Sequence, residues 1–222
     1  MRKYFLVLSL LAFLSCKRVE GEPFGLNFYF ENPQPINDAE LSKIPNKFHG
    51  LFMSSDSIYV NIHENIILKE YYSKFRFLKK DFDSIKGDFD RVGSNYISKL
   101  NQDVYEAKFL KDSIEFSTKK IDTFFIFSNK QKVKRFNGQL VLNCKDSIFW
   151  TVKLMRLENN KLNIKYIYSD EDLKRIDSLT RIKSTRIDSS SFIIKPSRNE
   201  FKRILNLKKL GEDMVYKKMQ NN

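Results

Sequence analysis

The sequence predicts a mainly β protein, an antiparallel meander that forms a barrel or a sandwich, with two short C-terminal helices. Two observations carry this prediction. The 222 residues include 20 Phe and 10 Tyr but only 7 Gly, and bulky aromatic side chains favour strands. From about residue 48, short apolar runs alternate with polar turn signals at the spacing that is typical of a meander, a barrel or a sandwich.

The strand signals follow one another along the chain. The first predict strands near residues 57–63, 65–72 and 74–79, and a polar interval at 81–95 comes after them. Further strands are expected within these stretches: 103–110, 113–119, 121–128, 132–136, 139–144, 147–157 and 161–169. Asn159 and Asn160 tolerate the positive φ of a two-residue turn, so the last two stretches are predicted to form a hairpin.

The C-terminal part carries the apolar spacing of helices in residues 169–182 and 196–205. Each segment begins with a pair of residues that can cap a helix: Ser169 with Asp172, and Ser197 with Glu200. Gly211 is expected to stop the second helix. Residues 212–218 then return as a last predicted strand.

The N-terminus has the layout of an export signal. Arg2 and Lys3 are positively charged, and residues 4–14 form an apolar stretch broken only by Ser9. At about eleven residues, that stretch is too short to cross a bilayer as a helix but suits a signal peptide. A small residue and a cysteine follow it directly.

This arrangement resembles the signal peptide of bacterial lipoproteins, in which a small residue precedes a Cys that is lipidated on sulfur and becomes the new N-terminus. Ser15 and Cys16 fit that pattern, whereas Phe13 replaces the usual Leu. The resemblance implies cleavage after residue 15 and a lipid anchor, such as palmitate, on Cys16. Lys17, in place of Asp, implies an outer-membrane, periplasm-facing location. A conventional signal-peptidase cut and an uncleaved anchor are the alternatives.

The expected domain organisation follows from proline content. Residues 16–45 are predicted to be the lipidated Cys and a tether, because they contain four of the five prolines, which block helices and central strands alike. Within this segment, residues 24–30 are aromatic-rich, so we expect them to pack on the body as an edge strand. Residues 46–222 are predicted to form one β-rich domain with a helical C-terminal part.

No catalytic motif stands out. The glycines are scattered singly, so neither a phosphate-binding loop nor a nucleophile elbow is present in the sequence. His49 and His63 lie far apart, and with Cys144 they give too few ligands for a zinc site. We therefore expect no catalytic residues, no metal, no cofactor and no enzyme activity, and we expect Cys144 to be a buried structural thiol.

The charge balance points to an anionic partner. The chain has 40 basic and 27 acidic residues, a net charge of +13. In residues 129–136, Lys132 and Lys134 share one face of the expected strand and Arg135 lies on the other, so these three are possible anion-binding residues. The alternative is that the excess is dispersed surface lysine. A nucleic-acid partner conflicts with the export signal, so we expect none.

Together these features predict a lipid-anchored cell-envelope protein that is a non-enzymatic binding module for an anionic or amphipathic envelope component. The alternative is an accessory or immunity-type lipoprotein that acts by protein–protein interaction. Residues 49–52, "HGLF", weakly resemble the Gly-x-Trp start of lipocalin-type barrels, with Phe52 in place of Trp. That resemblance implies an apolar ligand inside a barrel. The alternative is that the aromatic side chains form a solid core with no ligand.

Overall fold

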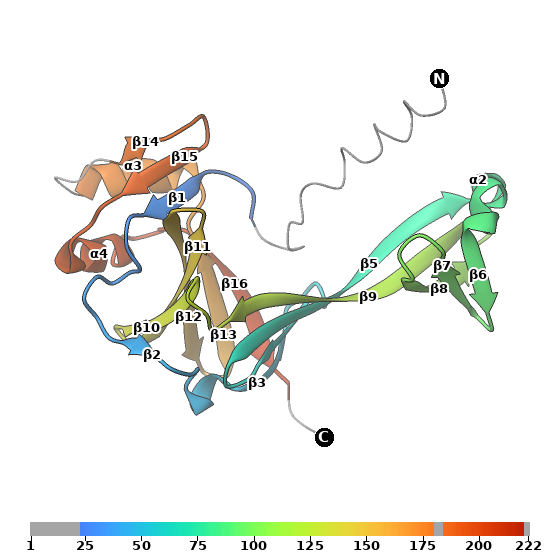
Figure 1. The fold of residues 1–222 in the computed structure, drawn as a ribbon, viewed down its shortest axis with the longest axis horizontal. Helices are drawn as coiled ribbons and strands as arrows, with labels where there is room; N and C mark the ends of the chain where they lie inside the picture. The colour runs from blue at the N-terminus through green and yellow to red at the C-terminus, as the bar shows by residue number, and fades with distance from the viewer. Residues whose placement is uncertain (1–22, 180–183, 220–222) are drawn as a thin grey trace.

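The computed structural model describes residues 23–179 and 184–219, and it is mainly β, as predicted. The strands form one large, mainly antiparallel sheet, and three short helices accompany it (Figure 1). The sheet is not closed into a barrel, so the predicted barrel or sandwich is not confirmed. Cys16 and the predicted signal peptide lie outside the described residues.

The chain divides into a body and a projecting arm that ends in a small lobe (Figure 1). The body comprises the described residues before 66 and after 126. Its strands are β1 (Asn27–Phe30), β2 (Glu40–Leu41), β3 (Gly50–Met53), β4 (Tyr59–Ile62), β10 (Gln131–Phe136), β11 (Gln139–Asp146), β12 (Phe149–Glu158), β13 (Lys161–Tyr166), β14 (Thr185–Arg186), β15 (Ser191–Ile194) and β16 (Glu212–Lys218).

Strand β12 is the centre of the body's sheet. It pairs with β11 on one side, and on the other side it pairs with β13 from Leu154 onward and with β1 at Trp150. From β13 the sheet continues through β16, β3 and β4 to the arm, while β11 leads to β10 and β2. Apart from an isolated bridge between Ser128 and Gln131, the described residues show no pairing between the arm and β10, and the sheet is open there.

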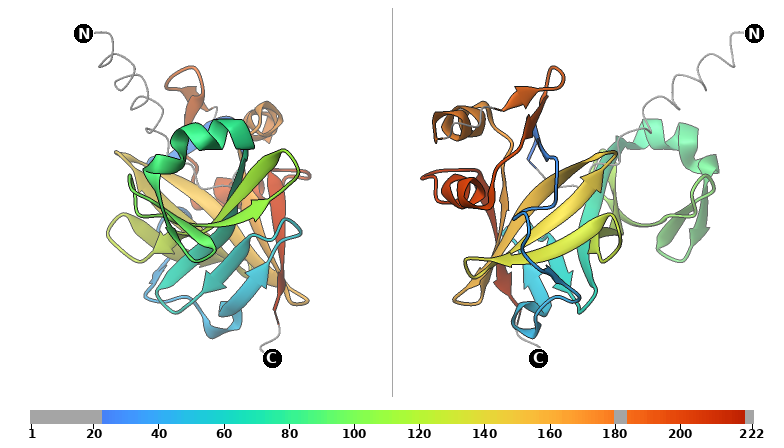
Figure 2. Two further views of the ribbon diagram at one scale, coloured as in Figure 1. Left: turned by 90° about the vertical axis from the view of Figure 1, so that its right-hand side faces the viewer. Right: turned by 60° about the vertical axis from the view of Figure 1, so that its left-hand side comes forward.

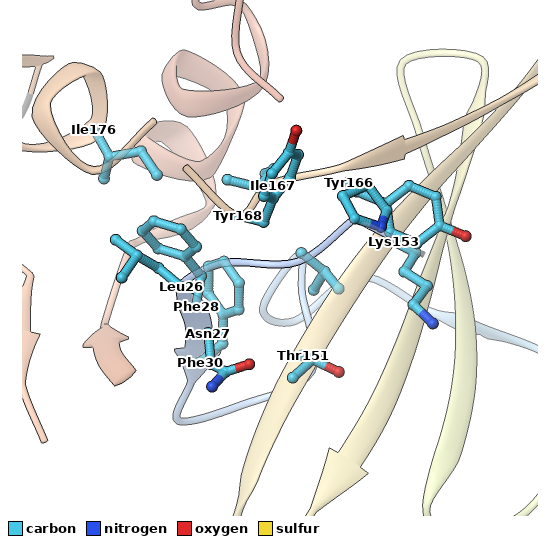
Figure 3. A pocket seen from close by; sticks show the side chains of 12 residues that line it. Leu26, Asn27, Phe28, Phe30, Thr151, Lys153, Tyr166, Ile167, Tyr168 and Ile176 are labelled. Carbon is cyan, nitrogen blue, oxygen red and sulfur yellow. The ribbon is translucent and has the colours of Figure 1, made fainter. Parts of the chain in front are cut away.

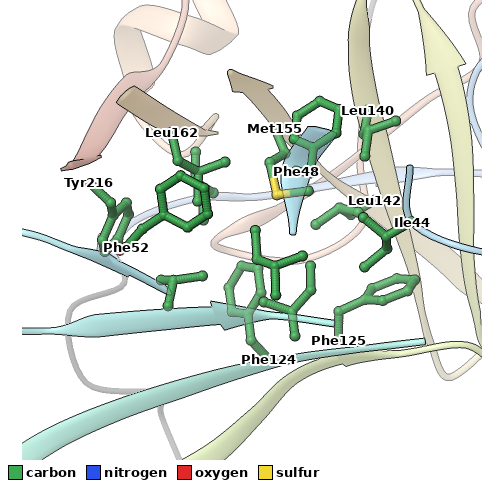
Figure 4. Close-up of a cluster of buried hydrophobic side chains, with 14 of the residues drawn as sticks. Ile44, Phe48, Phe52, Phe124, Phe125, Leu140, Leu142, Met155, Leu162 and Tyr216 are labelled. Atoms are coloured by element: carbon green, nitrogen blue, oxygen red, sulfur yellow. The ribbon is translucent and has the colours of Figure 1, made fainter. Parts of the chain in front are cut away.

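The body has two apolar cores, one on each face of β11 and β12. The first core lies inside the curved sheet and includes Phe52, Phe125 and Met155, all fully buried (Figure 4). The second core is covered by α3 (Asp170–Leu179) and α4 (Arg198–Leu205), which contribute Ile176, Phe201 and Ile204. Burying one such side chain contributes about 1.5–3 kcal/mol, so this face fixes the position of both helices.

Both C-terminal helices begin at the residues that the sequence predicts. The Asp172 N–H donates to Ser169 Oγ at 3.1 Å, and the Ser169 N–H donates to Asp172 Oδ2 at 3.1 Å. Ser197 and Glu200 form the same reciprocal arrangement at the start of α4. Each pair satisfies backbone N–H groups that have no partner within the helix.

Gly211 follows α4 at a crowded position. Its φ is +63°, and a Cβ atom there would lie 2.3 Å from the carbonyl oxygen of Tyr166. α4 itself ends at Leu205, six residues earlier than the glycine that was expected to stop it. The residue is needed for the close approach of this turn to the end of β13.

The arm consists of β5 (Ile66–Leu78) and β9 (Ser113–Ile126), which pair along their whole length. The lobe is residues 79–112, with α2 (Lys79–Ile85), β6 (Phe89–Val92), β7 (Asn95–Ser98) and β8 (Val104–Phe109). Short 3-10 turns occupy Lys86–Asp88 in the lobe and Asn46–Phe48 in the body. Figure 2 shows the lobe and the helices α3 and α4 at opposite ends of the molecule.

The segment predicted to be a tether is packed onto the body over its described part. β1 packs on the body as expected, but it is not the edge strand that was predicted, because it pairs with β15 on one side and with β12 on the other. Beyond it, Gln34 and Ile44 are buried as well. Apolar residues between the prolines account for this difference from a free tether, because they give the segment surface to bury.

Candidate functional site

The predicted anion-binding residues lie on β10, with the face alternation expected of a strand. Lys132 Nζ is 2.7 Å from Glu40 Oε1. Lys134 is buried, and its Nζ donates to the carbonyl oxygens of Pro33 at 3.1 Å and Pro35 at 2.8 Å.

Burial lowers the pKa of Lys134, because it penalises the charged ammonium group. Arg135 is exposed on the opposite face. The structure therefore uses Lys132 and Lys134 to hold residues 33–40 against β10, and anion binding by the three residues stays a prediction.

The cysteine and histidines do not form a cluster. Cys144 is half-buried on β11 and packs against the first core. His49 Nε2 lies 2.9 Å from the carbonyl oxygen of Ile44. Within the described ranges, no group of three or more His, Cys, Asp or Glu side chains is placed to hold a metal ion.

A cavity of about 220 Å³ opens where β13 leaves β12 and β1 takes its place. Figure 3 shows Leu26, Phe28 and Ile176 together on one side of it, with Tyr166 and Lys153 on the other. Lys153 Nζ lies 4.6 Å from the centre of the Phe124 ring, so this cation stands between the cavity and the first core. Sequence reasoning missed the cavity because its walls come from distant segments.

The lobe is built around one aromatic residue. Phe116 is fully buried, and six other rings surround it at centroid distances of 5.3–6.0 Å. These rings belong to Phe75, Phe77, Phe82, Phe89, Tyr96 and Tyr105. Each such pair contributes about 0.5–1.5 kcal/mol beyond simple burial. The lobe's core contains no residue of the body, so the lobe has its own source of stability.

A groove of about 450 Å³ lies where the lobe joins the arm. It forms because β8 pairs with β9 only as far as Glu106 opposite Ser117. Beyond Ser117, that edge of β9 has no strand neighbour among the described residues. Val104 and Lys119 line the groove, and an ion pair between Asp103 and Lys120 crosses between the two strands beside it.

The arm and lobe concentrate exposed apolar side chains. Residues 66–126 are fewer than a third of the described chain, yet they hold eight of its thirteen exposed large hydrophobic residues. These are Tyr72, Leu78, Val92, Leu100, Val104, Phe109, Ile121 and Ile126. Leu100 is 92% exposed. Single exposed apolar residues are normal on any surface, but their uneven distribution distinguishes the arm and lobe from the body.

The part of the arm between body and lobe, called the neck, is a two-stranded ribbon formed by residues 71–73 and 118–120. Two polar contacts brace it. Lys119 Nζ is 2.6 Å from Glu70 Oε2, a hydrogen bond that raises the pKa of Lys119. Tyr71 Oη donates to Asp122 Oδ2 at 2.9 Å. A two-stranded ribbon is marginally stable alone, so these contacts matter for the position of the lobe.

Comparison with protein-family models, with curated proteins and with solved structures gives no match for this chain. No helix within residues 23–179 and 184–219 is long and apolar enough to cross a membrane.

Proposed function

We propose that this chain is a lipid-anchored envelope protein that acts without catalysis, by binding another protein through its arm and lobe. Of the two functions that the sequence predicts, the arm favours the accessory or immunity-type role. The supporting observation is the eight exposed apolar side chains on a projecting element with its own core. Aromatic and aliphatic side chains at the centre of a patch supply most of the affinity in protein–protein contacts.

Site-specific crosslinking tests the arm. We place a photo-crosslinking residue at Leu100 or Phe109 in the full chain, in cells that naturally express it, and at the exposed body residues Ile148 and Ile187 as controls. A discrete crosslinked species should form from the lobe positions and not from the body positions. Equal capture from both sets would count against the arm as the binding element.

A matched pair of variants makes that test specific. L100D/V104D places two carboxylates beside the groove, and I148D/I187D makes the same charge change on the body. The crosslink from Phe109 should disappear in the first variant and persist in the second, because a buried unpaired carboxylate is costly at an interface. Retention of the crosslink in L100D/V104D would contradict the proposal.

The anchor is tested at Cys16, which lies outside the described residues. Cys16→Ala should abolish labelling by palmitate. Cys144→Ala is the matched control, because it removes the chain's other cysteine and should leave labelling unchanged. Palmitate labelling that persists in Cys16→Ala would refute the anchor.

The cavity supports a second candidate function, binding of a small amphipathic molecule. Its lining combines apolar side chains with polar ones, among them Lys153 and Tyr168. Native mass spectrometry of the protein purified from its own membranes should then detect a bound molecule that Ile176→Trp, which fills the space, removes. The absence of any bound molecule in the wild-type protein would exclude this candidate.

The second candidate function is the one for which the sequence predicts a barrel or sandwich, because a barrel can hold a ligand inside. The support for that architecture is the first core inside the curved sheet, where Lys153 Nζ of β12 lies 4.6 Å from the centre of the Phe124 ring of β9.

A further inference from the structure

We propose that Lys202, Arg203, Lys208 and Lys209, called the basic cluster, form a docking surface for anionic phospholipid headgroups and hold the helical side of the body against the membrane. The inference rests on the proposed anchor at Cys16, and it assigns a second membrane contact, one made by the folded domain itself.

The cluster is an excess of unpaired positive charge. Residues 195–209 contain six basic side chains and one acidic side chain, Glu200. Lys195 pairs with Glu31 and Arg198 pairs with Asp38. Glu200 is occupied by its capping contacts with Ser197. The remaining four basic side chains are exposed and make no ion pair with any other residue in the described part of the chain.

The structure of the body needs only part of this charge. Phe201 and Ile204 anchor α4 in the second core, which leaves Lys202 and Arg203 on the outer face. Basic residues in the last turn of a helix complement its dipole, and this accounts for those two. It does not account for Lys208 and Lys209, which lie beyond the helix end. Lys209 also adopts φ +60°, a conformation that glycine or asparagine adopts with less strain.

A chain of contacts connects Lys209, at one end of the cluster, to the point where the N-terminal segment enters the body. The Leu26 N–H donates to the Tyr168 carbonyl at 2.6 Å, and the Tyr168 N–H donates to Asp172 at 3.2 Å. Asp172 in turn accepts from the Gly211 N–H at 2.7 Å. Arg175, one turn along α3, donates to the Lys209 carbonyl at 2.8 Å.

The length of chain before Leu26 limits how far the body lies from the bilayer. Seven residue steps separate Cys16 from Pro23, a reach of about 25 Å when fully extended. The entry point must therefore stay within that distance of the anchored membrane, and the contacts above connect it to the segment that carries Lys209. Each Lys or Arg at an anionic surface raises affinity about fivefold, and one acyl chain alone binds reversibly.

Docking in this way would also set the direction of the arm. Figure 1 shows α4 at one end of the molecule's long axis and the lobe at the other. With the basic cluster on the headgroups, the lobe projects away from the bilayer, where a protein partner can reach it.

Vesicle flotation tests the surface without the anchor. The protein is the chain from residue 17 onward, which retains every contact described above. At about 0.1 M salt, it should float with vesicles that contain phosphatidylglycerol and not with pure phosphatidylcholine vesicles. Binding to the anionic vesicles should weaken as the salt concentration rises, because salt shortens the screening length.

Two variants with equal charge change identify the residues. K202Q/R203Q/K208Q/K209Q should lower affinity for the anionic vesicles at least about 100-fold. K74Q/K80Q/K108Q/K111Q removes four exposed charges from the arm and lobe and should change it less than about threefold. Glutamine preserves helix propensity, and circular dichroism verifies that both variants are folded.

Three results would overturn the docking surface. They are equal loss in the two variants, no binding of the wild-type chain to anionic vesicles, and cluster-dependent capture of an acidic protein without vesicle binding. Palmitate labelling at Cys16 is read independently. If the protein floats in a cluster-dependent way but Cys16 is not labelled, the docking surface stands and the anchor is refuted. If Cys16 is labelled but flotation does not depend on the cluster, the anchor stands and the docking surface is refuted.

Discussion

The body and the lobe both bury aromatic side chains, but the body does so in two large cores and the lobe in one small core. The body spreads its apolar residues over two cores and covers one of them with helices. The lobe gathers six rings around a seventh, that of Phe116. Residues 66–126 have 12 basic and 10 acidic residues, whereas the other described residues have 22 and 15. The body therefore carries most of the net positive charge, and the arm and lobe carry most of the exposed large apolar side chains.

This difference indicates a division of tasks within one chain. A charged, well-covered body stays in solution and tolerates a charged membrane surface. A lobe with a rigid aromatic centre can display apolar residues without losing its shape. The following predictions test whether the two regions are as independent as their separate cores imply.

The largest expected effect is at the centre of the lobe. Phe116→Ala should remove about 3–5 kcal/mol of lobe stability, because the cavity lies among six rings and cannot collapse easily. Hydrogen exchange should accelerate for residues 79–112 and remain unchanged for 139–166. Simultaneous acceleration in both ranges would show that the lobe and the body unfold together.

Asp172→Asn should destabilise the body by about 2–3 kcal/mol, as loss of a buried charged acceptor does. The Asp172 carboxylate accepts the N–H groups of Tyr168, Ser169 and Gly211, and its side chain is almost fully buried. Asp170→Asn, on the exposed side of the same turn, is the matched control. Chemical denaturation followed by Trp150 fluorescence measures both, and equal effects would contradict the role of Asp172.

Loss of the cap at the start of α4 should cost less. Ser197→Ala removes the hydroxyl that accepts the Glu200 N–H, and such caps contribute about 1 kcal/mol. Asn199→Ala, two residues along, should be nearly neutral. Both variants are measured by thermal unfolding, and hydrogen exchange in the lobe should not respond to either.

The smallest effect concerns pH. Burial, together with a hydrogen bond to Asp146, raises the pKa of Tyr29 to about 12. Because this value exceeds the ordinary pKa of about 10, the neutral phenol stabilises the folded body below pH 10. That contribution is lost as pH rises from 10 through 12. Tyr29→Phe should flatten this part of the stability profile, and an unchanged slope would show that Tyr29 is not responsible.

Much of the body could be predicted from sequence because its signals are local. Asn159 and Asn160 have the positive φ expected of the hairpin turn. The capping pairs of α3 and α4 and the strand β16 also stand where local chemistry predicts them. In these places the residues that determine the conformation are neighbours in the chain.

The arm and the lobe could not be predicted in the same way. The sequence indicates separate strands at 65–72 and 74–79, with Ser73 as the break between them. In the structure both stretches belong to one strand, β5, in which Ser73 is an ordinary strand residue. The strands predicted at 113–119 and 121–128 are likewise one continuous strand, β9. Residues 81–95 were expected to be a polar interval. Phe82 and Phe89 look isolated among charges there, and only the return of β9 brings Phe116 against them.

The predicted anion-binding residues show a related limit. Periodicity places Lys132 and Lys134 on one face correctly. It cannot show that Glu40 and the carbonyl oxygens of Pro33 and Pro35 cover that face. The four residues of the basic cluster are separated by a helix end, and the contacts that connect Lys209 to Leu26 are ones that only the fold reveals.

Strand β9 belongs to two structures at once. It is half of the arm, and it is also the border of the open side of the body's sheet, facing β10. At its body end, the arm's other strand, β5, pairs with β4. The direction of the arm and the edge of the open side are therefore determined by the same strand, β9.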